Sequence, residues 1–182
     1  MKNIHTLLIP DVHGRSFWKE ALEKYNKEDY PNLTIVFLGD YVDPYEFEGV
    51  SRQDAIDNFQ EIIDVAKSNN RIHLLIGNHD MHYWYDCGFK SRVDPNYKNC
   101  KVIKDLFLQN FTLFNIAYEE TINDKRYLYT HAGVSSFWFQ HLQFVGKMSL
   151  SMHIDRLREE QVEYCEFLKN FTLSADNLNK LK

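Results

Sequence analysis

The alternation of apolar and polar positions over residues 4 to 76 predicts three strands separated by helices. Three short apolar runs have the length of buried strands: Ile4–Pro10, Leu33–Leu38 and Ile72–Ile76. Apolar residues recur at helical spacing in the two segments between them, Ser16–Lys27 and Ser51–Lys67. Strands that alternate with helices predict an α/β fold, in which the strands are parallel and the crossovers right-handed.

The helix predicted over Ser51–Lys67 has the clearest start signal of the chain. Ser51 is followed three residues later by Asp54, a spacing that is typical of a capping box. An apolar stripe at helical spacing follows and consists of Ala55, Phe59, Ile62, Ile63 and Ala66. We therefore expect one face of this helix to be buried.

The residues after position 100 predict a different arrangement. The alternating segments Phe111–Tyr118 and Arg126–Thr130 flank the turn signal Asn123-Asp124, so we expect a β-hairpin. The polar stretch over residues 174–182 is expected to be frayed. Three further segments are predicted to be helical: Lys101–Gln109, Ser136–Phe144 and Met152–Lys169.

Composition adds that this is an ordinary globular chain. It has 182 residues, of which 44% are hydrophobic and 26% charged, and it contains no internal repeat or Gly/Ser linker. We therefore expect a single domain over residues 1–182, with the motifs below within 4–135 and a helical part over 136–182. The three cysteines form no C-x-x-C pair, which favours free thiols: Cys87, Cys100 and Cys165.

Charge and hydropathy exclude several kinds of partner. A net charge of −5 argues against nucleic-acid binding, because contacts to a phosphate backbone require clustered Lys and Arg. No apolar run approaches the roughly 20 residues of a membrane span. The apolar stretch within Met1–Pro10 is too short for a signal-peptide core. We therefore expect a cytoplasmic protein, whose oligomeric state the sequence leaves open.

Candidate chemistry lies where the predicted strands end. Each of the three parallel strands is followed by a polar cluster, and a fourth cluster follows the second strand of the hairpin. In an open α/β sheet the carboxyl ends of the strands line a common crevice, so these clusters are expected to converge. The four clusters are Asp11-Val12-His13-Gly14, Gly39-Asp40-Tyr41-Val42-Asp43, Gly77-Asn78-His79-Asp80 and Thr130-His131-Ala132-Gly133.

The residue types in these clusters match a binuclear metal site. Carboxylate and imidazole ligands suit Mn, Fe or Zn. Two such ions about 3.5–4 Å apart would clamp the oxygens of a phosphoryl displacement and generate a hydroxide nucleophile. Asp40 is the natural carboxylate to bridge the ions. Each cluster alone is also compatible with an ordinary turn, and His131 with a packed histidine, so the prediction depends on the conjunction of all four.

These motifs resemble those of the calcineurin-like metallophosphoesterase superfamily, which are D-x-H-G, G-D-x-x-D, G-N-H-[ED] and a later H-x-G. The spelling GDYVD and HAG is most similar to the phosphoprotein-phosphatase and diadenosine-tetraphosphatase branch. The resemblance implies a β-sheet sandwich flanked by helices and hydrolysis of a phosphate ester with two divalent metal ions. The matching residues are Asp11/His13, Asp40/Asp43, Asn78/His79/Asp80 and His131/Gly133.

The resemblance also implies a role for each matching residue. Asp40 would bridge the two ions, and His79 would protonate the leaving alkoxide rather than bind metal. Asp43 is the expected hydrogen-bond partner of His79, and Asp80 is expected to fix its loop by accepting backbone N–H bonds. The implied metal ligands are Asp11, His13 and Asp40 for the first ion, and Asp40, Asn78 and His131 for the second.

The sequence departs from the family pattern in two places. Pro44 stands where the phosphatase branch has an arginine that binds the phosphate, so Arg15 or Arg52 is a candidate substitute. His82 is a further candidate for a contact with the substrate. The family adds a late histidine, often in G-H-x-H, but no G-H occurs here, and only His141 and His153 follow His131. We therefore expect a version that is shortened at its C-terminus and lacks the last strands.

These departures leave a rival hypothesis open. A chain without the last metal ligand could be a catalytically impaired relative that acts as a binding scaffold. The intact ligand set in the four clusters argues against that alternative. An unrelated nucleotide-binding α/β protein is a poorer alternative, because the chain contains neither G-x-G-x-x-G nor G-x-x-x-x-G-K-[ST].

Overall fold

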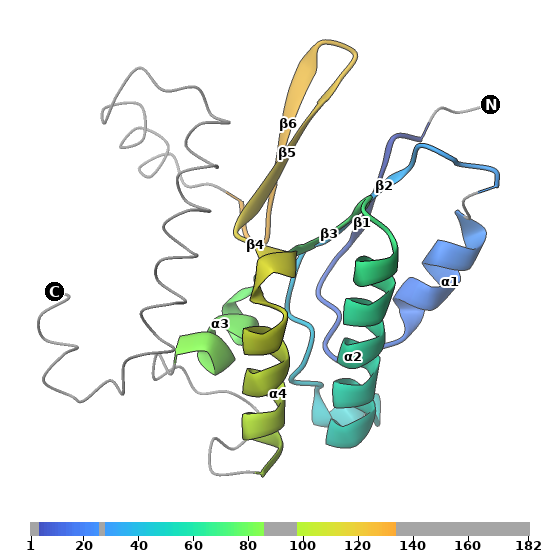
Figure 1. Cartoon of the computed structure of the whole chain (residues 1–182). Helices are drawn as coiled ribbons and strands as arrows, with labels where there is room; N and C mark the ends of the chain where they lie inside the picture. The colour runs from blue at the N-terminus through green and yellow to red at the C-terminus, as the bar shows by residue number, and fades with distance from the viewer. Residues whose placement is uncertain (1–3, 26–27, 86–97, 134–182) are drawn as a thin grey trace, which may run out of the picture.

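The computed structural model describes residues 4–25, 28–85 and 98–133, and its centre is a parallel β-sheet (Figure 1). Its strands lie in the order β1-β2-β3-β4, and every neighbouring pair is parallel. In the register Thr6 lies opposite Thr34, and Ile35 lies opposite Ile72. The strands are β1 (Thr6–Ile9), β2 (Thr34–Phe37), β3 (Ile72–Leu75) and β4 (Phe114–Asn115).

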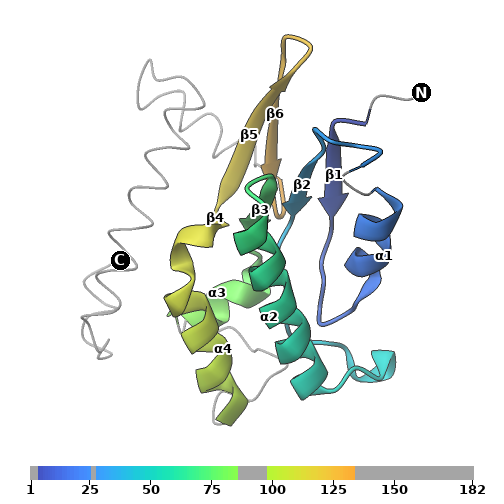
Figure 2. The same ribbon diagram turned by 45° about the vertical axis from the view of Figure 1, so that its right-hand side comes forward.

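Helices cover one face of this sheet (Figure 2). The described helices are α1 (Phe17–Lys24), α2 (Arg52–Ser68), α3 (Asn78–Tyr85) and α4 (Lys98–Gln109), with two short 3₁₀ helices, η1 (Glu46–Glu48) and η2 (Phe111–Leu113). Trp18 of α1, Phe59 of α2 and Phe107 of α4 share one hydrophobic core with Phe37 and Leu74 of the sheet. The capping box of α2 is confirmed, because Ser51 Oγ accepts from the N–H of Asp54 at 3.1 Å and an Asp54 oxygen accepts from the N–H of Ser51.

The opposite face of the sheet contacts a β-hairpin formed by β5 (Ala117–Ile122) and β6 (Lys125–Thr130). Successive strand residues point to opposite faces, so Thr6 and His73 point away from the helices. The Thr6 hydroxyl donates to Glu120 of β5, and the ring of His73 stacks on that of Tyr118 at 3.8 Å between centroids. The described part of the chain is therefore layered as helices, parallel sheet and hairpin, consistent with the sandwich expected from the sequence.

The prediction for the first hairpin strand was wrong in its bounds, although the hairpin itself is confirmed. Asn123 and Asp124 form the turn with φ of 50° and 62°, the positive values that a tight two-residue hairpin turn needs. The expected single strand over 111–118 is instead divided between η2, β4 and the start of β5. Phe114 is 2% exposed and completes the parallel sheet, whereas Ile116 is 45% exposed between the two strands. The alternating segment thus contributes β4 to the parallel sheet and the start of β5 to the hairpin.

Several predictions concern residues outside the described ranges. These are the helices over Ser136–Phe144 and Met152–Lys169, the end of the chain over 174–182, and the two late histidines, His141 and His153. The expectation of a shortened C-terminus remains a prediction. Within the described ranges, no helix is long and apolar enough to cross a membrane.

Candidate metal centre

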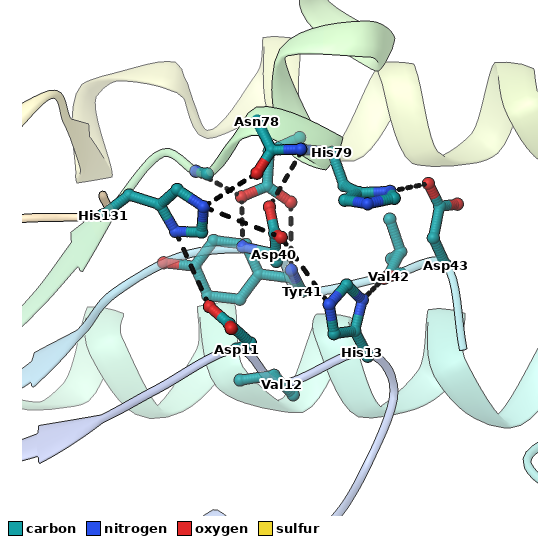
Figure 3. A network of polar contacts seen from close by, with 12 residues as sticks. Asp11, Val12, His13, Asp40, Tyr41, Val42, Asp43, Asn78, His79 and His131 are labelled. Atoms are coloured by element: carbon teal, nitrogen blue, oxygen red, sulfur yellow. Dashed lines mark hydrogen bonds and ion pairs between the residues drawn. The ribbon is translucent and has the colours of Figure 1, made fainter. Parts of the chain in front are cut away.

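The four polar clusters converge at the carboxyl end of the parallel sheet (Figure 3). Asp11 and His13 follow β1, and Asp40 follows β2. Asn78 is the first residue of α3, which begins shortly after β3, and His131 directly follows β6. The hairpin thus brings the last of these side chains to the same place as the three strand ends. The convergence expected from the sequence is present in the structure.

The backbone at this site adopts a conformation that non-glycine residues rarely adopt. His13, Asp40 and Asp43 have φ of 46°, 55° and 63°. Each residue in such a conformation costs on the order of 1–3 kcal/mol, and such residues cluster at functional sites. Hydrogen bonds between the two loops hold them in place: the N–H of His13 donates to the Asp40 carbonyl at 2.7 Å, and that of Gly14 to Tyr41 at 2.8 Å.

Two glycines allow the loops after β2 and β3 to touch. A Cβ added to Gly39, whose φ is +103°, would lie 2.3 Å from the backbone nitrogen of Gly77. A Cβ added to Gly77 would lie 2.1 Å from Oδ1 of Asp40. A side chain larger than hydrogen would therefore push the two loops apart at Gly39 and would displace Asp40 at Gly77.

Substitution Gly39→Ala is expected to lower the free energy of unfolding by about 2–5 kcal/mol, because it adds a backbone clash to an unfavourable φ. Gly49→Ala is the matched control: its φ is +68°, but nothing lies within 4 Å of the added Cβ. The control should lose only about 1–2 kcal/mol. Urea unfolding of both variants measures the difference, and equal losses would show that the contact between the loops does not matter.

The ligand atoms of three side chains lie close enough to hold one ion. A carboxylate oxygen of Asp11, a carboxylate oxygen of Asp40 and a ring nitrogen of His131 lie within 4.8 Å of one another. Oδ2 of Asp40 is 3.6 Å from Nε2 of His13 and 3.7 Å from Nε2 of His131. Asp40 is therefore the carboxylate that lies close to Nε2 of both histidines.

Hydrogen bonds on the far side of each ring fix which nitrogen faces the site. Nδ1–H of His13 donates to the carbonyl of Val42 at 3.0 Å, and Nδ1–H of His131 donates to the carbonyl of Leu38 at 2.8 Å. In both rings, Nε2 therefore faces Asp40. Metal-binding histidines are typically oriented by such a bond from the other nitrogen.

The environment of His131 Nε2 fits a cation. Oδ1 of Asn78 lies 2.9 Å from this nitrogen and Oδ2 of Asp40 lies 3.7 Å from it. With Nδ1 protonated, a neutral His131 has a lone pair on Nε2, so three acceptors point at one another. A proton on Nε2 or a metal ion among the three removes the conflict. Oxygen and imidazole ligands of this kind suit divalent transition metals, so the residues present fit the expected group.

Asp40 and Asp80 form the buried acidic centre of the site. Oδ1 of Asp40 accepts from the N–H of His79 at 2.9 Å. Asp80 accepts three backbone N–H bonds, from Asp40, Tyr41 and Gly77, at 2.7–3.0 Å, which is the role in fixing the loop that the sequence led us to expect. Complete burial raises the pKa of Asp80 to about 7, and the nearby Asp40 carboxylate acts in the same direction.

A second group of side chains lies beside the acidic centre. Nδ1 of His79 donates to Oδ2 of Asp43 at 2.9 Å, the pairing that the sequence suggested. The hydroxyl of Tyr83 donates to the other oxygen of the same carboxylate, which is fully buried. Tyr83 lies outside the four sequence motifs, so this contact was not predicted. His79 and Tyr83 are four residues apart on α3 and therefore lie on one helix face. Tyr83 could have been identified from this spacing only if the helix had been predicted.

Arg15 and His82, two of the three candidate substrate contacts, are placed differently. The guanidinium of Arg15 is held by Glu48 at 3.0 Å and by the carbonyls of Val12 and Asp11. His82 is 7% exposed, and its Nδ1 has no hydrogen-bond partner among the described residues. Both positions flank the centre in sequence, and their roles stay predictions.

The fold and the site together define an α/β protein with a candidate metal centre at the carboxyl edge of its sheet. The family model described as calcineurin-like phosphoesterase matches residues 4–174. The chain therefore belongs to the calcineurin-like phosphoesterase family, which supports a hydrolase that acts on phosphoesters and binds divalent metal ions. No curated protein matches the chain significantly.

Proposed function

We propose that the protein hydrolyses a phosphate monoester or diester at a binuclear metal centre, with His79 as the general acid. The observation that carries this proposal is the arrangement around Asp40. Its Oδ2 lies 3.6–3.7 Å from the Nε2 atoms of His13 and His131, and both rings are oriented by backbone carbonyls on their far side. Such a centre supports phosphoryl transfer better than a purely structural role.

The residues divide into two sets that share Asp40. Following the family resemblance, Asp11 and His13 would hold the first ion with Asp40, and Asn78 and His131 would hold the second with the same carboxylate. The close group of Asp11, Asp40 and His131 lies where the two sets meet. When bound, divalent ions such as Mn, Fe or Zn stabilise the charge that develops on phosphoryl oxygens and activate water as a nucleophile. The chain contributes oxygen and imidazole ligand atoms, and backbone carbonyls orient the two imidazole rings.

His79 would supply the proton that the leaving oxygen needs. Its ring packs edge-on against that of His13, with 5.1 Å between centroids, so it borders the centre. Since Nδ1–H is directed at Asp43, the proton on Nε2 is the one available for transfer. Asp43 and Tyr83 act as positioning residues, because they hold the ring without reaching the substrate.

Metal content and turnover, measured on the same samples, test the proposal. After exchange into Mn²⁺, we expect two ions per chain and hydrolysis of an aryl phosphate. Removal of the ions with a chelator should abolish hydrolysis, and adding Mn²⁺ back should restore it. One ion or none, with no hydrolysis at any tested metal concentration, would contradict the proposal and favour the rival role of a binding scaffold.

A further inference from the structure

An exposed aromatic pair lies at the edge of the candidate centre, in the segment that follows Asp43. Tyr45 is the N-cap residue of η1 and Phe47 is its middle residue. Their rings stack at 5.2 Å between centroids with 24° between planes. Phe47 is 83% exposed, more than any other large hydrophobic residue in the described ranges, and Tyr45 is 40% exposed. An aromatic surface so exposed often marks a binding site.

The aromatic pair is in ring contact with the histidines of the candidate centre. The ring of Tyr45 lies 5.5 Å from that of His13, and the ring of His13 lies 5.1 Å from that of His79. Four rings therefore form a row that runs from the candidate general acid to the surface. Because His79 contacts His13 and His13 contacts Tyr45, a leaving group that His79 protonates would have the aromatic pair nearby.

The short helix that carries the pair is held firmly. Glu48 accepts from the N–H of Tyr45 at 3.0 Å through one carboxylate oxygen and from Arg15 at 3.0 Å through the other. Gly49 ends the helix with φ of 68°. A platform that is ordered before binding loses little entropy when a ligand stacks on it.

We propose that Tyr45 and Phe47 bind an uncharged aromatic leaving group and thereby determine the class of substrate. The inference rests on the proposed phosphoesterase function and names its substrate class, phosphate esters of alcohols or phenols that carry an aromatic ring. Stacked aromatic pairs contribute enough for a preference of roughly 2- to 10-fold over a saturated ring. Glu46, the residue between Tyr45 and Phe47 in the sequence, is exposed. Its negative charge disfavours a leaving group that carries further negative charge.

Benzyl phosphate and cyclohexylmethyl phosphate test the proposal, because both release a primary alcohol and differ mainly in the aromaticity of the ring. In the metal-loaded wild-type protein, kcat/KM for the benzyl ester should be roughly 2- to 10-fold higher. Phe47→Leu keeps an apolar side chain but removes the ring, so the ratio should fall toward one. Tyr127→Leu, at an aromatic residue of the hairpin that is 41% exposed, is the control and should keep the wild-type ratio.

A binding measurement separates this inference from the proposed function. Benzylphosphonate and cyclohexylmethylphosphonate cannot be hydrolysed, and calorimetry on the metal-loaded protein gives their dissociation constants without turnover. Tighter binding of the benzyl compound in the wild type, lost in Phe47→Leu, would support the aromatic platform even if neither ester is hydrolysed. The absence of hydrolysis would contradict only the proposed function. Equal affinities in the wild type, no binding of either compound, or a preference that persists in Phe47→Leu would overturn the inference.

Discussion

Asp40→Asn should remove bound metal and lower turnover by at least about 10²–10³-fold. The carboxylate lies between His13 and His131, and the substitution replaces a carboxylate oxygen that would bind the metal by an amide NH₂ group, which cannot. That amide can donate to Nε2 of either histidine, while its oxygen keeps the bond from the N–H of His79. The metal-free variant should therefore be as stable as the metal-free wild type.

Elemental analysis, steady-state kinetics and thermal unfolding of the same preparations check this expectation. Asp57→Asn is the matched control, because Asp57 is an exposed residue of α2 whose carboxylate accepts a hydrogen bond from the side chain of Gln53 at 2.8 Å, away from the site. The control should retain wild-type metal content and turnover. Two ions bound to Asp40→Asn would contradict the bridging role of Asp40.

The sequence predicted the convergence of the site because parallel strands leave little freedom in where their ends lie. Asp11 and Asp40 each follow a buried apolar run, and adjacent parallel strands necessarily bring such positions to one edge. The hairpin was predictable at its turn, since Asn123-Asp124 accepts positive φ at both positions. The pairing of His79 with Asp43 followed from the family resemblance rather than from spacing.

Two features of the site depended on tertiary structure that the local pattern does not encode. The cluster Gly77-Asn78-His79-Asp80 was interpreted as the end of a strand and no helix was predicted after it, but α3 begins at Asn78 and continues to Tyr85. Helix propensity is weak in this histidine- and aromatic-rich segment, and the helix is stabilised by Asp80 at its start, through bonds to the loop after β2. Tyr83 could not be identified without that helix.

The aromatic pair was missed for a different reason. Tyr45 and Phe47 stand two residues apart in a segment whose other residues are acidic, so no periodicity distinguished them. Their significance comes from the left-handed backbone at Asp43, which turns the chain so that η1 lies beside His13. A positive φ at a non-glycine residue is not readable from the residue type.

His79→Ala should lower turnover of benzyl phosphate by about 10²–10⁴-fold while leaving metal content unchanged. The ring donates to Asp43, whereas only the backbone N–H of His79 contacts Asp40, and alanine keeps that bond. Alanine also favours the helical conformation of α3. The expected loss is therefore a loss of proton donation and not of structure or metal.

The dependence on the leaving group distinguishes proton donation from other roles of the ring. The 4-nitrophenolate group leaves without a proton, so His79→Ala should slow the hydrolysis of 4-nitrophenyl phosphate far less than that of benzyl phosphate. If His79 instead bound metal, both substrates would be slowed equally and elemental analysis would show fewer ions. Because the ring packs against His13 rather than pointing at Asp40, we expect unequal slowing with the metal retained. If hydrolysis of the two esters were slowed equally, His79 would not be the general acid.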